Sequence, residues 1–63
     1  MNRVREKRQE IGMTQLELAN LTQVTRQTIG LIEKDLYNPS IKICILICKA
    51  LGTTLDDIFW EDE

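Results

Sequence analysis

The sequence contains no histidine, and its 63 residues include only two cysteines, three glycines, one proline and three aromatic side chains. Without histidine, a hydroxyl or thiol nucleophile has no imidazole to activate it, and a metal site lacks the commonest ligand. Cys44 and Cys48 lie one helical turn apart, but no further cysteine completes a site, so we expect them to be small buried hydrophobic residues. The sequence therefore predicts neither an enzyme nor a metal or cofactor site.

Long apolar runs are also missing. The most apolar stretch, residues 43–48, is flanked by Lys42 and Lys49 and is far too short to cross a membrane. The N-terminal residues MNRVREKRQ contain no apolar segment that resembles a secretory signal. We therefore expect a cytoplasmic protein that forms one domain over residues 1–63. A chain of this size buries only about 60% of its unfolded surface.

Charge is distributed unevenly along the chain, whose net charge is −2. Residues 1–55 contain all eight basic residues against five acids, which gives +3, whereas residues 56–63 contain five acids and no base, which gives −5. A cationic body with an acidic C-terminus can present one face to phosphate groups and keep the other face away from them. An acidic tail that only aids solubility explains the C-terminal charge equally well.

Helix signals dominate the pattern, and no segment shows a convincing strand period. The expected helices cover residues 2–11, 15–22, 26–34, 41–51 and 55 to 59 or 60. Thr14 with Glu17 matches a capping box, and Thr25, Ser40 and Thr54 match N-caps. The residues expected on the inner faces of the first three helices are Val4, Arg8, Ile11, Leu18, Ala19, Leu21, Ile29 and Ile32. The fold class is therefore a compact all-α domain of five helices.

The second and third helices are separated only by a tight turn near residues 22–24, in which Val24 is the apolar side chain that keeps them crossed. This layout is typical of a helix-turn-helix over about residues 14–34. In such a unit the first helix crosses the DNA backbone and the second lies in the major groove, where each base pair presents a distinct pattern of donors and acceptors. Two amphipathic helices with a short turn also occur in proteins that do not bind DNA.

The outward face of the third helix has an unusual composition for a plain surface. At about 100° per residue, the residues that point outward are Arg26, Gln27, Gly30, Leu31 and Lys34. Arg26 can donate two hydrogen bonds to guanine, and Gln27 can pair with adenine. Gly30 allows the backbone to approach the groove floor, Leu31 can contact a thymine methyl group, and Lys34 can reach a phosphate. The pattern favours double-stranded DNA as the partner.

Several motifs together resemble the Cro and phage-repressor type of helix-turn-helix regulator, the Xre family. They are TQxELA at residues 14–19, VTRQTI at 24–29, YNPS at 37–40 and ALG at 50–52, and the resemblance extends from Arg8 to Trp60. It implies a lambda-repressor-like DNA-binding fold in a bacterial or phage-encoded protein. By the same resemblance, the residues that contact DNA include Gln15, Thr25, Arg26, Gln27, Thr28 and Leu31.

The resemblance also assigns structural roles. Gln15, at the start of the second helix, would brace Gln27 and touch a phosphate. Arg8 and Glu33 match a partly buried ion pair that joins the first helix to the third; two unrelated surface charges are the alternative. Two departures stand out: Gln23 occupies the position of the usual turn glycine, which implies modest strain, and Lys34-Asp35 replaces a common Asn-Gly, which puts an acid near the phosphate path.

The fourth expected helix is apolar over most of its circumference, more than a small core can cover. A homodimer would cover the remaining apolar surface, with the interface formed by Ile45, Leu46, Ala50, Phe59 and Trp60; core packing without a partner is the alternative.

These features predict a sequence-specific transcriptional regulator, a repressor that binds a short palindromic operator as a homodimer. The competing hypothesis is an antitoxin-like or other protein-binding module that uses the same apolar helix and the acidic C-terminus. No small-molecule ligand is evident.

Overall fold

The computed structural model describes residues 2–59, which form five α-helices. These are α1 (Val4–Glu10), α2 (Gln15–Thr22), α3 (Arg26–Glu33), α4 (Ile41–Leu51) and α5 (Leu55–Ile58). The prediction of an all-α fold with a central helix-turn-helix is confirmed. Trp60, which was assigned to the dimer interface, lies outside the described residues. Within them, no helix is long and apolar enough to cross a membrane.

Helices α2 to α5 begin where the sequence predicted because their N-cap side chains accept hydrogen bonds from first-turn backbone amides. Thr14 and Glu17 form both halves of a capping box, with Glu17 N donating to Thr14 Oγ1 (3.1 Å) and Thr14 N donating to Glu17 Oε1 (3.0 Å). The Thr14 backbone N–H, and after it the Thr14 side chain, hold the pKa of the Glu17 carboxyl below its ordinary value. The stabilisation from the ionised cap is therefore present above the ordinary pKa and is lost as the pH falls through the lowered one.

One core runs through all five helices, and its buried members are Val4, Leu18, Ala19, Ile29, Ile32, Ile47, Cys48, Leu51 and Ile58. The assignment of Ile11 and Leu21 to this core was wrong, since their exposed fractions are 53% and 57%. Ile11 follows the end of α1 and lies in the turn before α2. On α2 the inner face turns one position further than expected, so Thr22 is buried in place of Leu21, and its hydroxyl donates to the Leu18 carbonyl (2.7 Å).

The turn between α2 and α3 is built on Gln23, whose φ of 61° and ψ of 31° are left-handed. This conformation costs a residue with a side chain roughly 1–2 kcal/mol, which is why glycine is common at such positions. The backbone N–H groups of Gln23 and Val24 both donate to the Ala19 carbonyl. Val24 packs against the core, so an apolar anchor offsets part of the strain in the turn.

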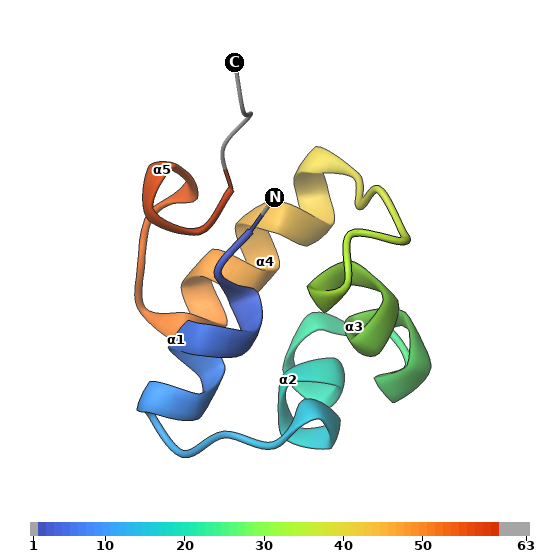
Figure 1. The fold of residues 1–63 in the computed structure, drawn as a ribbon, viewed down its shortest axis with the longest axis horizontal. Helices are drawn as coiled ribbons and strands as arrows, with labels where there is room; N and C mark the ends of the chain where they lie inside the picture. The colour runs from blue at the N-terminus through green and yellow to red at the C-terminus, as the bar shows by residue number, and fades with distance from the viewer. Residues whose placement is uncertain (1, 60–63) are drawn as a thin grey trace.

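The packing leaves one side of α3 free. In Figure 1, α2 and α3 lie side by side, and α4 runs diagonally through the centre of the view and packs against α2, α1 and α5. The N-terminal residues lie beside α5, where Asn2 and Phe59 form an isolated antiparallel bridge and Arg3 N donates to the Ile58 carbonyl (2.9 Å). Residues 2 and 3 are therefore occupied in backbone pairing, and α1 starts at Val4, two residues later than predicted.

Candidate nucleic-acid interface

The first turn of α3 presents its polar side chains to solvent. Arg26 and Gln27 are exposed, and they directly follow the N-cap Thr25, whose hydroxyl accepts from Thr28 N (3.1 Å). Lys34, directly after α3, is exposed as well. Thr28, Gly30 and Leu31 are half-buried, so Leu31 offers only part of its side chain to a partner. The exposed side of α3 thus has hydrogen-bonding groups at its start, a half-buried apolar side chain in its middle and a cation just after its end.

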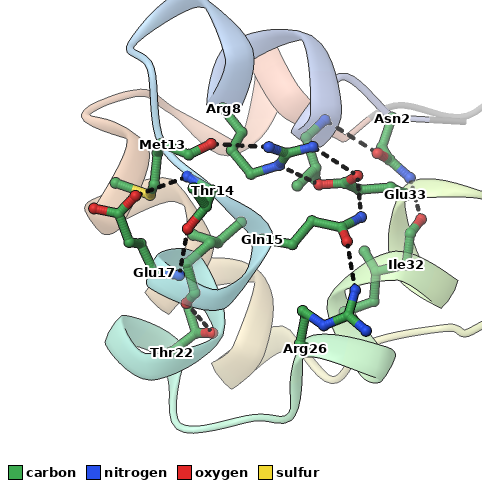
Figure 2. Close-up of polar contacts among 12 residues, drawn as sticks. Asn2, Arg8, Met13, Thr14, Gln15, Glu17, Thr22, Arg26, Ile32 and Glu33 are labelled. Atoms are coloured by element: carbon green, nitrogen blue, oxygen red, sulfur yellow. Dashed lines mark hydrogen bonds and ion pairs between the residues drawn. The ribbon is translucent and has the colours of Figure 1, made fainter.

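A buried ion pair joins α1 to α3. Arg8 Nε donates to Glu33 Oε2 (2.8 Å) and Arg8 Nη2 donates to Glu33 Oε1 (3.3 Å). Arg8 Nη1 donates to the Met13 carbonyl (2.8 Å), which ties in the segment between α1 and α2. The two side chains are only 10% and 3% exposed. The Arg8–Glu33 contact expected from the family resemblance is therefore a buried, bidentate pair (Figure 2).

Gln15 extends this network to the exposed side of α3. Its Nε2 donates to Glu33 Oε1 (3.1 Å), and its Oε1 accepts from Arg26 Nη1 (3.5 Å). The sequence interpretation had this amide brace Gln27, but the structure gives it Glu33 and Arg26 as partners. The physical reason is that the buried Glu33 carboxylate needs further donors. Figure 2 shows the resulting chain of contacts, which runs from the Met13 carbonyl through Arg8, Glu33 and Gln15 to Arg26.

Asn2 makes structural contacts that were not predicted from the sequence. Its Nδ2 donates to the Ile32 carbonyl (2.8 Å) and to Asp35 Oδ1 (2.9 Å), while its Oδ1 accepts from Val4 N (3.1 Å). One amide thus joins the start of α1 to the end of α3. An asparagine just before a helix is a capping signal, but Asn2 had been placed inside the first helix. Asp35, at φ 59°, takes the left-handed position that ends this segment.

Cys44 and Cys48 are buried on the inner side of α4. Burial raises the pKa of both thiols, and for Cys48 the neighbouring Cys44 and Asp57 raise it further. Both side chains therefore remain neutral thiols at physiological pH, which suits core packing. Among residues 2–59, no group of three or more histidine, cysteine, aspartate or glutamate side chains is placed to hold a metal ion.

Two short helices crossed at a tight turn, with the second one exposed along its polar side, define the helix-turn-helix class of DNA-binding domain. A family model described as helix-turn-helix matches residues 4–58. The chain belongs to this family, the Xre type of DNA-binding transcriptional regulators.

Individual relatives agree with this assignment. The chain is 42% identical over 62 residues to the uncharacterised HTH-type transcriptional regulator YgzD of Bacillus subtilis, covering 98% of this chain and 94% of that protein. It is 33% identical to the immunity repressor of Bacillus phage phi105, covering 95% of this chain and 42% of the repressor. The fold is similar to the crystal structure of the restriction-modification controller protein C.AhdI from Aeromonas hydrophila, with a TM-score of 0.85, 30% identity, and coverage of 90% of this chain and 86% of that chain.

Proposed function

We propose that the protein reads a short palindromic operator through α3 and represses transcription in the cytoplasm by occupying a promoter as a homodimer. The observation that carries the proposal is the first turn of α3. There Arg26 and Gln27 are exposed, and Arg26 is contacted by an amide that also binds the buried Glu33. A base-reading side chain gains specificity when a fixed neighbour limits its conformations. The relationship to a phage immunity repressor supports repression as the outcome.

Each exposed group has a chemistry suited to one part of DNA. Arg26 and Gln27 are assigned to base edges, where guanidinium and amide groups bind guanine and adenine bidentately. Leu31 is assigned to a thymine methyl group, and Gln15 and Lys34 to the backbone. Contacts from Thr25 and Thr28 at the start of α3 complete the proposed interface, with Gly30 as the point of closest approach.

The proposed dimer forms through the outer side of α4 and the start of α5. Ile45 is 39% exposed and Leu46 is half-buried; Ile41 and Leu55 add apolar area, with exposed fractions of 69% and 37%. Ala50 and Phe59 pack partly against the core, so they contribute less to the proposed interface than their sequence positions suggest. A protein-binding module would use the same apolar surface, but it would not need the polar first turn of α3. Two-fold symmetry of the dimer matches the symmetry of a palindromic site.

Substituting Arg26 and Lys34 separately tests the reading of bases. Arg26→Ala should weaken binding to the preferred duplex by about 1–3 kcal/mol and flatten discrimination at one base pair per half-site. Lys34→Ala should weaken binding to all sequences alike. It should also reduce the salt slope, which is the steepness with which the logarithm of the binding constant falls with the logarithm of the salt concentration, by roughly one for each phosphate that is no longer neutralised. The preferred duplex comes from selection on random DNA, and both variants are titrated against cognate and scrambled duplexes at several salt concentrations. An unchanged cognate-to-scrambled ratio for Arg26→Ala would contradict base reading by that residue.

Replacing Gly30 by alanine should change the stability of the fold and the affinity for DNA in opposite directions. A Cβ added there meets only Gln15 Nε2, at an ordinary contact distance of 3.7 Å. Because alanine is the better helix former, Gly30→Ala should raise the free energy of unfolding by up to about 1 kcal/mol. If α3 approaches the groove floor at this point, the added methyl group should weaken DNA binding. Urea denaturation and duplex titration measure the two effects, and a variant that is more stable and binds fully would remove Gly30 from the interface.

A further inference from the structure

The basic residues of the described chain divide into those that form ion pairs and those that do not. Arg3, Lys7 and Arg8 form ion pairs with Glu6, Glu10 and Glu33. Within residues 2–59, the basic residues that form no such pair are Arg5, Arg26, Lys34, Lys42 and Lys49. Lys42 and Lys49 lie on α4 and are exposed. The other three lie around one hollow in the surface.

This hollow has a volume of about 640 Å³ and lies between α1, the start of α2 and α3. Its wall residues contain four positive charges, from Arg5, Arg8, Arg26 and Lys34, against the single negative charge of Glu33. They therefore have a net charge of +3, whereas the whole chain has −2. Because Arg8 already pairs with Glu33, the charges left to attract a ligand are those of Arg5, Arg26 and Lys34.

Backbone donors add to the positive potential of this hollow. Gln15 and Leu16, the first two residues of α2, both line it. Their amides have no partner within the helix, and the Thr14 cap is used by the Glu17 amide. The first turn of a helix also has the positive end of the helix dipole. Cationic side chains and free amides are the donors that bind an oxyanion such as a phosphate.

We propose that this hollow holds a phosphate of the DNA backbone and that Arg5, on α1, is one of its ligands. The inference rests on the proposed function and extends the contact surface beyond the helix-turn-helix, from which every DNA contact predicted from the sequence comes. Arg5 lies three residues before Arg8, so the two side chains lie on the same side of α1. Arg8 is committed to Glu33, whereas the guanidinium of Arg5 is exposed and free to bind a phosphate bidentately.

The test compares Arg5→Ala with Lys49→Ala, which removes the same charge from α4. Each neutralised phosphate contributes about 0.9 to the salt slope, so Arg5→Ala should reduce the slope by about 0.9 and weaken binding about eightfold at 0.1 M salt for each half-site. For a palindromic duplex bound by the proposed dimer, the two losses together make about 1.8 in slope and about 60-fold in affinity. Lys49→Ala should remain within about twofold of the wild type. Arg5→Lys, which keeps the charge, should recover most of the affinity. Arg5 is exposed and forms no ion pair, so circular dichroism should show an unchanged fold.

A neutral methylphosphonate, placed at successive positions along the cognate duplex, locates the phosphate. At one position per half-site it should weaken binding by the wild type much more than binding by Arg5→Ala, because the variant no longer has the arginine that binds this phosphate. Equal losses for Arg5→Ala and Lys49→Ala, or the absence of such a position, would overturn the role of Arg5 while leaving base reading by Arg26 intact. Failure of the wild type to prefer any duplex would overturn the proposed function and this inference together.

Discussion

Replacing Arg8 by alanine should lower the free energy of unfolding by about 3–5 kcal/mol. The cause is the Glu33 carboxylate, which is 3% exposed and would lose both Arg8 donors, leaving only the Gln15 amide. Removing one partner of a buried pair leaves an uncompensated charge in a poorly solvated place. Domains have only about 5–15 kcal/mol of net stability, and one this small lies near the lower end. Urea denaturation followed by circular dichroism should show that the variant has lost most of its stability.

Two controls separate burial from charge. Lys7→Ala breaks the Lys7–Glu10 ion pair (3.7 Å), in which the side chains are 33% and 55% exposed, and should cost at most about 1 kcal/mol. The double variant Arg8→Met with Glu33→Leu removes both charges, so it should be considerably more stable than Arg8→Ala. If Arg8→Ala and Lys7→Ala unfolded at the same urea concentration, the Arg8–Glu33 pair would contribute no more than a surface ion pair.

Charging the outer side of α4 should have the largest effect on DNA binding. Ile45→Glu places a carboxylate in the proposed interface, at a side chain that is already 39% exposed, so the monomer should stay helical. A palindromic duplex should then bind about 10²–10⁴-fold more weakly, because the second half-site is no longer tethered to the first. Affinity for a single half-site should remain close to that of the wild type. Sedimentation and titration of the two duplexes measure both effects.

Leu21→Glu is the matched control for assembly, since Leu21 is 57% exposed but lies on α2. It should leave the sedimentation of the wild type unchanged. A wild type that is monomeric at high micromolar concentration would contradict the proposed homodimer. A different protein that binds this surface, and is displaced by Ile45→Glu, would support the antitoxin-like alternative instead.

Local interactions made most of the fold predictable from sequence. Thr14, Thr25, Ser40 and Thr54 cap helices within three residues of themselves, and each cap lies where its pattern predicted. The inner face of α2 was misjudged at Leu21 because a helix's rotation depends on the helices it packs against.

Contacts between distant residues were the least accessible to sequence analysis. Asn2 and the Ile32 carbonyl are 30 residues apart, and nothing near either residue indicates their contact. The partners of Gln15 depend on where Glu33 is buried. The Arg8–Glu33 pair itself was expected from the family resemblance, since spacing alone does not distinguish it from two surface charges.

The contacts of Asn2 connect the end of α3 to the C-terminal part of the described chain. Its backbone pairs with Phe59, beyond α5, while its amide holds the Ile32 carbonyl and Asp35 at the end of α3. One residue therefore contacts both the last turn of α3 and the residue that follows α5. Coupling free energies are reciprocal, so if the proposed dimer shifts Phe59 and the proposed operator shifts the end of α3, each would change the affinity for the other by the same factor.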